Sequence, residues 1–202
     1  MIAIIDYGVG NLFSLASSLK SLGLETKVTR DAAAIRAADH IILPGVGAFA
    51  DAMAKLEATG LVPVIKQEVE HKPLLGICLG MQLLFEKSYE YGEHAGLGFI
   101  QGEVCPLEPD LKDPALKVPQ IGWNALHILR DDPLFQYIQE GEYVYYVHSY
   151  YGKNCTESTL ATSEYSIPVT GAVRAGKVYG TQFHPEKSGD TGLRILKAFA
   201  EL

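Results

Sequence analysis

Apolar and polar positions follow two different rhythms along the first half of the chain. Three short, mainly apolar runs are typical of buried strands and lie at residues 2–6, 40–43 and 73–77, and residues 25–29 can form a further strand. After the first run, leucines recur at helical spacing up to Gly23, at Leu12, Leu15, Leu19 and Leu22. This alternation of strands and helices predicts an α/β fold whose mostly parallel sheet is covered on both faces.

The remaining pattern completes the prediction. Further helices are expected at residues 32–38, where Asp31 caps the start, at about 51–71 with an interruption near Gly60 and Pro63, and at 79–86. Strands are expected at residues 99–107, 122–128, 142–150, 172–174 and 178–182. A last amphipathic helix at 188–202 would turn Leu193, Leu196 and Ala200 inward. No repeat or linker divides the chain, so we expect one domain over residues 1–202.

Composition narrows the class of protein. The chain has 202 residues, of which 48% are apolar and 20% charged, so it can fill a core and is not expected to be disordered. Its 17 basic and 24 acidic residues give a net charge of −7, which argues against binding nucleic acid through phosphates. No apolar run reaches about 18 residues, and the first residues lack the basic start of a signal peptide. We therefore expect a cytoplasmic protein without a membrane span.

One of the three cysteines stands in an unusual setting. Residues 74–82 read LLGICLGMQ, which places Cys78 between Gly76 and Gly80 at a tight turn from an apolar strand into a helix. Side chains two residues before and after the nucleophile would collide in such a turn, hence the glycines. A helix N-terminus favours a thiolate, and the Leu79 N–H would supply half of an oxyanion hole. Cys78 is therefore the candidate nucleophile, although a buried cysteine can also be an inert core residue.

The other cysteines have no comparable setting. Cys105 precedes a proline and Cys155 lies in a polar segment, so neither is expected to be reactive. The three are far apart and odd in number, which gives no disulfide framework and no zinc spacing.

A histidine near the end of the chain is the candidate base. The segment GTQFHPE at residues 180–186 places His184 where a strand ends, and parallel sheets carry their sites beyond the carboxyl ends of strands. Glu186 lies two residues on, so in extended chain it faces the same side and can fix the imidazole tautomer. A surface His and Glu after a strand is the plainer interpretation. Of the other histidines, only His148 is expected near the site, and no pair has metal-ligand spacing, so we expect no metal.

The two motifs together carry a family resemblance. GICLGMQ at residues 76–82 with HPE at 184–186 resembles the class I glutamine amidotransferases, which use a Cys-His-Glu triad. The resemblance implies a flavodoxin-like α/β domain with a mixed, mostly parallel central sheet flanked by helices. It also implies hydrolysis of the glutamine side-chain amide to glutamate and ammonia through a γ-glutamyl thioester, without a cofactor.

Over its whole length the chain is similar to one branch of this family, the glutaminase subunits of imidazole glycerol phosphate synthase. The segments that carry this likeness are DYGVGNL at 6–12, LPGVGAF at 43–49, PQIGWN at 119–124, VHSY at 147–150 and HPEKS at 184–188. Two departures are mild: Gln120-Ile121 stands where His-Met or a similar pair is common, and Ser149 where Thr is frequent. The branch belongs to histidine biosynthesis, and the implied partner is a (β/α)₈-barrel cyclase subunit in a heterodimer. That partner would use the ammonia to make imidazole glycerol phosphate and aminoimidazole carboxamide ribotide.

The resemblance also implies roles for residues around the triad. The Val46 N–H would join that of Leu79 in the oxyanion hole, and the glycines beside Val46 either let this peptide rotate or simply form a turn. If the peptide is misaligned until the partner is occupied, resting glutaminase activity is low. Residues implied to hold the glutamine are Gly47, Gln82, Glu90, Ser149 and Tyr150. Without the resemblance, Gln82 could as readily be a solvated helix residue, though it shares a helix face with Cys78, and Glu90 would by default belong to a charged surface.

Four further residues are implied at the partner interface: Asn11, Trp123, Tyr145 and Lys187. Trp123 is the only tryptophan, and it could be an interface anchor or a core residue.

Two other functions stay open from the sequence. The chain could be the glutaminase of another amidotransferase, such as an anthranilate, aminodeoxychorismate, guanylate or pyridoxal phosphate synthase. The segments at residues 6–11 and 187–188 argue against this. It could also be a non-catalytic binding subunit that kept the fold, which the intact Cys78, His184 and Glu186 argue against.

Overall fold

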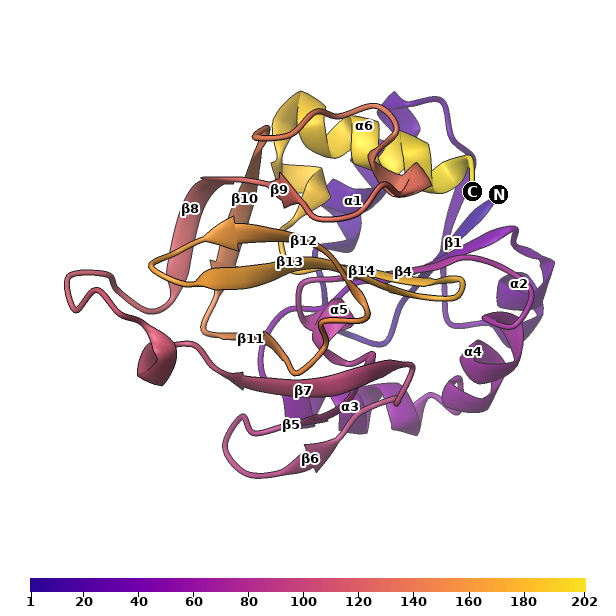
Figure 1. The fold of residues 1–202 in the computed structure, drawn as a ribbon. Helices are drawn as coiled ribbons and strands as arrows, with labels where there is room; N and C mark the ends of the chain where they lie inside the picture. Colours follow the sequence, from indigo (N-terminus) through magenta and orange to yellow (C-terminus); the bar gives the residue numbers. More distant parts are fainter.

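The computed structural model describes all 202 residues and is built around an eight-stranded sheet (Figure 1). In spatial order its strands are β2 (Thr26–Thr29), β1 (Ile2–Ile5), β3 (His40–Leu43), β4 (Leu74–Ile77), β14 (Val178–Thr181), β13 (Pro168–Ala175), β12 (Thr159–Glu164) and β9 (His127–Ile128). The pairs from β2 to β14 are parallel, whereas those from β14 to β9 are antiparallel. The predicted mixed α/β fold is confirmed.

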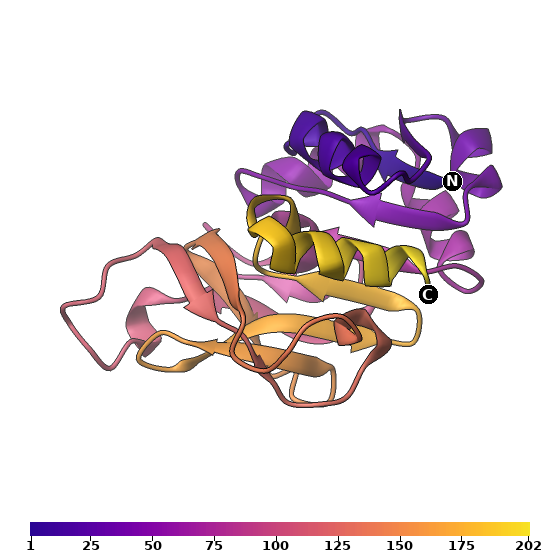
Figure 2. The same ribbon diagram turned by 90° about the horizontal axis from the view of Figure 1, so that it is seen from above.

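Helices cover both faces of this sheet, because successive strand residues point to opposite sides. In β1, Ile2 and Ile4 join one apolar core, while Ala3 and Ile5 join the other. The first core packs against α1 (Leu12–Ser21) and α6 (Gly189–Ala200), which lie together on one side of the sheet in Figures 1 and 2. The second core packs against α2 (Ala32–Ala37), α3 (Phe49–Ala58) and α4 (Val62–Glu68). None of the helices has both the length and the apolar character needed to span a bilayer.

Two smaller sheets flank the central one. A four-stranded sheet has the order β11 (Tyr150–Lys153), β7 (Ile100–Pro106), β5 (Phe85–Ser88) and β6 (His94–Ala95). A two-stranded antiparallel ribbon consists of β8 (Gln120–Ala125) and β10 (Tyr143–His148). Short helical turns complete the chain, namely α5 (Leu79–Gln82), η1 (Glu108–Asp110), η2 (Pro133–Phe135) and η3 (Pro185–Lys187).

Several local predictions were wrong. The helix expected at residues 79–86 ends at Gln82, because Phe85 turns into the core as the first residue of β5. In α6, Ile195 and Phe199 are fully buried, whereas the expected Leu193 and Ala200 are only half-buried. The polar strand β12 was missed because its Thr and Ser residues lack an apolar run.

Candidate active site

Cys78 occupies the sharp turn between β4 and α5 that the sequence predicts. Its backbone has φ 54° and ψ −112°, a left-handed conformation that side chains seldom adopt. A Cβ placed on Gly76 would lie 2.7 Å from the Gly80 carbonyl oxygen, which explains the glycine spacing. Because α5 has only four residues, its dipole is small, and Cys78 must draw on other groups to stabilise a thiolate.

The segment after β3 packs against this turn. A Cβ on Gly80 would overlap the Leu43 carbonyl, and one on Gly45 would lie 2.7 Å from the Gly80 N. The buried Tyr7 hydroxyl donates to the Pro44 carbonyl at 2.6 Å, and this fixes the segment from its other side. The backbone at Leu43–Gly45 therefore lies close to the backbone at Gly80, and this places Val46 at the pocket.

Beyond Gly45 the segment is exposed to solvent. The Val46 side chain is 42% exposed, and its N–H makes no hydrogen bond. Gly47 has φ 96°, and a Cβ there would meet nothing within 4 Å. The peptide that carries the Val46 N–H lies between Gly45, whose Cα packs against Gly80 and Tyr7, and exposed Val46. Rotation of this peptide stays a prediction.

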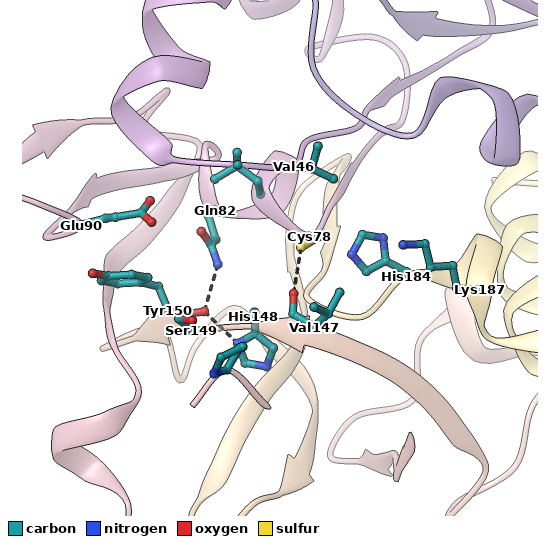
Figure 3. A pocket seen from close by; sticks show the side chains of 13 residues that line it. Val46, Cys78, Gln82, Glu90, Val147, His148, Ser149, Tyr150, His184 and Lys187 are labelled. Atoms are coloured by element: carbon teal, nitrogen blue, oxygen red, sulfur yellow. Dashed lines mark hydrogen bonds between the residues drawn. The ribbon is translucent and has the colours of Figure 1, made fainter. Parts of the chain in front are cut away.

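His184 and Glu186 form a buried pair beside the nucleophile. The His184 Nδ1 lies 2.8 Å from the Glu186 Oε1, and both side chains are almost fully buried. The His184 backbone N–H donates to the Tyr145 carbonyl of β10 at 2.9 Å. The His184 Nε2 has no hydrogen-bond partner, and the ring lies next to the Cys78 sulfur in Figure 3.

Two opposing effects set the charge of this ring. Burial alone lowers the pKa of His184, but the Cys78 sulfur and the Glu186 carboxylate outweigh burial and raise the pKa to about 9. At neutral pH the ring is thus protonated beside the sulfur, an arrangement that favours a thiolate–imidazolium pair.

A pocket of about 350 Å³ opens over the Cys78 sulfur (Figure 3). All the residues that the resemblance implied for the oxyanion hole and the glutamine line it: Val46, Gly47, Leu79, Gln82, Glu90, Ser149 and Tyr150. His184 and Lys187 complete the wall, together with Pro119, Val147 and His148. Residues more than one hundred positions apart therefore meet around one sulfur atom.

Glu90 has a contact that the sequence did not indicate. Its Oε2 accepts a hydrogen bond from the Phe49 N–H at 2.6 Å, at the start of α3. The carboxylate is thereby held at the pocket wall, opposite the Cys78 end of the cavity (Figure 3).

The four predicted interface residues lie near one another on the ribbon and beside it. Trp123 is 51% exposed and stacks edge to face on Tyr145, with ring centroids 5.9 Å apart, so it is not a core residue. Lys187 is exposed, and Asn11 is half-buried where its side chain caps α1. Ile121, 61% exposed, and Tyr143, 59% exposed, continue the apolar ribbon face on which Trp123 and Tyr145 lie.

Gln182 is a residue near the sulfur that sequence reasoning missed. It is fully buried, and its Nε2 lies 3.7 Å from the Cys78 Sγ. Its Oε1 accepts a hydrogen bond from the Gln82 Nε2 at 3.1 Å. No local pattern marks it, because Gln182 follows the end of β14 and reaches the sulfur only through the pairing of β14 with β4.

His148 is buried at the far wall of the pocket. Its Nδ1 lies 2.9 Å from the Tyr150 carbonyl oxygen, and its Nε2 lies 3.0 Å from the Gln120 Oε1. Burial lowers the pKa of His148 to about 4, against a smaller opposing effect of the Tyr150 carbonyl. With both ring nitrogens engaged by neighbouring oxygens, His148 is a structural group of the pocket wall. His127 lies 2.7 Å from the Glu140 carboxylate and away from the pocket.

His148 gives a prediction for stability in acid. An unfolded histidine takes up its proton near pH 6.5, whereas folded His148 resists protonation until about pH 4. The resulting stabilisation is present above pH 6.5 and is lost as the pH falls through 4. We expect this one group to remove about 3 kcal/mol over that interval.

Urea unfolding of His148→Gln and the wild type between pH 8 and pH 4 measures this effect. The variant should lose less stability than the wild type over the acid interval. Parallel pH profiles for the two proteins would contradict the prediction.

No three His, Cys, Asp or Glu side chains gather in an arrangement that could hold a metal ion.

Comparison with known proteins places this geometry in a family. The model of the glutamine amidotransferase class-I family matches residues 3–201. The chain is 50% identical over 203 residues to the imidazole glycerol phosphate synthase subunit HisH of Listeria monocytogenes, covering 100% of this chain and 96% of that one. It is 45% identical to the HisH subunit of Wolinella succinogenes, with 100% of both chains covered.

Solved structures with low identity share the fold. A putative GMP synthase subunit from Thermoplasma acidophilum has a TM-score of 0.71 at 21% identity, covering 99% of this chain and 92% of that one. PurLQS from Thermotoga maritima has a TM-score of 0.76 at 18% identity, with 99% and 97% covered. The full-length identity near 50% is the more specific finding, and it shows that the chain belongs to the class I glutamine amidotransferases and, within them, to the HisH glutaminase subunits of imidazole glycerol phosphate synthase.

Proposed function

We propose that residues 1–202 act as one domain and that its pocket hydrolyses the side-chain amide of glutamine, with Cys78 as the nucleophile. The Cys78 thiolate attacks the carboxamide carbon, ammonia leaves, and water then releases glutamate from the γ-glutamyl thioester. The observation that carries the proposal is the buried His184–Glu186 pair, whose unpartnered Nε2 faces the Cys78 sulfur.

His184 moves the protons of both steps. Because its raised pKa keeps the ring protonated beside the thiolate, its first act is to give that proton to the departing ammonia. The neutral ring then accepts a proton from the attacking water. Glu186, hydrogen-bonded to Nδ1, fixes the ring orientation and stabilises its cation.

The developing oxyanion needs two N–H donors. The Leu79 N–H, at the start of α5, has no partner within the helix. We assign the second donor to Val46, whose N–H makes no hydrogen bond and belongs to the peptide between Gly45 and Val46. The donor becomes effective when that peptide rotates toward the pocket, so the rotation can act as a switch.

The polar ends of glutamine meet the other end of the pocket. Its α-ammonium is matched by the Glu90 carboxylate and by the Gln82 side-chain oxygen, which points along the cavity toward Glu90 (Figure 3). Its α-carboxylate falls near Gly47, Ser149 and Tyr150. The amide then lies over Cys78.

The ammonia passes to a partner, because ammonia released into water is mostly protonated and can no longer attack. The partner is a (β/α)₈-barrel cyclase subunit, joined in a heterodimer in the cytoplasm. Exposed Trp123 and its ribbon neighbour Tyr145 supply an aromatic contact area, with Lys187 and Asn11 beside it. Val147 continues this ribbon into the pocket wall, so the contact face adjoins the site.

Glutamine hydrolysis by the free chain, compared with hydrolysis by the complex in which the cyclase subunit holds its nucleotide ligand, tests the proposal. We expect roughly 10²–10³-fold faster hydrolysis in the liganded complex, because that is the usual contribution of one oxyanion donor. Equal rates in the two states would contradict the role given to the Val46 peptide.

Trp123→Ala is the matched test of the interface. Its truncation removes the exposed aromatic contact but leaves the pocket residues in place, so we expect weaker complex formation and less stimulation at a fixed partner concentration. If the variant reached the wild-type stimulation of hydrolysis at the same partner concentration, the assignment of this face would be contradicted.

A further inference from the structure

The side-chain amide of Gln182 lies beside the Cys78 sulfur, and its neighbours fix which amide atom faces the sulfur. The Tyr150 backbone carbonyl can only accept hydrogen bonds, so the Gln82 group 2.9 Å from it must be the Nε2 donor. That same Nε2 lies 3.1 Å from Gln182, which must therefore present its Oε1 there. The Gln182 Nε2 is the group left to face the Cys78 sulfur, at 3.7 Å.

We propose that Gln182 is a catalytic residue of this enzyme: its side-chain N–H donates to the Cys78 sulfur and stabilises the thiolate, while its oxygen fixes the Gln82 amide. The inference rests on the proposed function for its consequence in catalysis, but the contact with sulfur stands independently. A donor to an ionised acceptor is stronger than one to a neutral acceptor, so this contact favours the thiolate over the thiol.

The surroundings of Cys78 make such a donor necessary. The helix that follows has only four residues and contributes little dipole, and the nucleophile is only 7% exposed, so water solvates the sulfur poorly. The titratable side chains around the sulfur and along the pocket are Tyr7, Glu90, His148, His184 and Lys187. Among them only His184 lies beside the sulfur as a cation. The Gln182 amide is an uncharged side-chain donor to the same sulfur atom.

The same amide sets what Gln82 offers to substrate. Both N–H groups of Gln82 are taken, one by the Tyr150 carbonyl and one by Gln182. Only the Gln82 oxygen remains for the pocket, so this position accepts a hydrogen bond and selects a ligand group that donates one. Gln182 thus connects the reactivity of the sulfur to the polarity of the substrate site.

Alkylation of Cys78 by iodoacetamide across a pH series measures the first role without glutamine. The reaction is followed by mass spectrometry on the peptide that contains Cys78, which separates it from Cys105 and Cys155. In Gln182→Met, of similar length but without the donor, we expect half-maximal alkylation to shift upward by roughly one pH unit. We also expect glutamine turnover to fall about tenfold in kcat.

Two further variants keep the test decisive. Gln182→Glu retains the oxygen toward Gln82 but puts a carboxyl group in place of the N–H, so the upward shift should be at least as large; it also serves if the Met variant does not fold. Gln82→Met keeps Gln182 but removes the donor that orients its amide, so it should raise KM for glutamine about tenfold and shift the alkylation profile by clearly less than Gln182→Met does.

An alkylation profile in Gln182→Met that matches the wild type would overturn the proposal. An equal shift in Gln82→Met would also overturn it, because the donor could not then be assigned to Gln182. Failure of the proposed function has a different signature: the wild type would not hydrolyse glutamine, while the alkylation profiles would still differ.

Discussion

Replacing Cys78 by alanine should lower glutamine hydrolysis by roughly 10⁴-fold or more, because no other group in the pocket can form the thioester. The alanine side chain fits the space of the thiol, so the fold and the ribbon face should remain intact. A complex made with this variant should therefore still use added ammonia at the wild-type rate. Assays of the complex with glutamine and with ammonium salts measure the two activities separately.

A conservative change at another cysteine provides the control for this prediction. Cys105 is half-buried in β7, outside the pocket, and Cys105→Ser should keep both activities. Glutamine-dependent synthesis that survives in Cys78→Ala would show that the ammonia has another source. Loss of the ammonia-dependent activity as well would show that the substitution disturbs the complex.

Replacing Gly80 by alanine should destabilise the protein by about 3 kcal/mol or more, because its Cβ would overlap the Leu43 carbonyl of a central strand. Neither side can yield easily: Leu43 is fully buried in β3, and Gly80 is fixed in the turn after the nucleophile. Any relaxation would also move Cys78 relative to His184, so hydrolysis should fall in the fraction that folds. Urea unfolding and glutamine hydrolysis measure the two effects.

Gly60→Ala separates backbone strain from overlap. Gly60 has φ 71°, and an added Cβ would meet nothing within 4 Å, so only strain of about 1–2 kcal/mol is expected there. If the two variants lost equal stability, the close approach between Gly80 and Leu43 would not be the cause.

The nucleophile and the central part of the fold could be predicted from the sequence, because both depend on residues close together in the chain. Apolar runs and leucine spacing predict the central strands and α1, and two glycines around Cys78 predict the turn. The segment from His184 to Glu186 is equally local, since its residues are two apart. The family resemblance then added residues from distant segments, and the structure brings these to one pocket.

What the sequence did not reveal depends on contacts between distant segments. Gln182 contacts the Cys78 sulfur only because β14 pairs with β4. The Tyr7 hydroxyl likewise binds the carbonyl of Pro44, which is 37 residues away in the sequence. The early end of α5 reflects the burial of Phe85 rather than any helix-breaking residue. The strand β12 escapes a periodicity analysis because Leu160 and Ala161 are its only apolar residues, and its place is set by pairing with β13 and β9.

The division between central sheet and ribbon has a consequence for how such enzymes diversify. The nucleophile belongs to the sheet, whereas the aromatic contact face belongs to β8 and β10, which touch the catalytic segment through Tyr145 and Ser188. The outward side chains of the ribbon can therefore be exchanged without altering the bend that carries the sulfur. The exposed surface of the ribbon can thus change while the sulfur, its neighbouring imidazole and the pocket stay as they are.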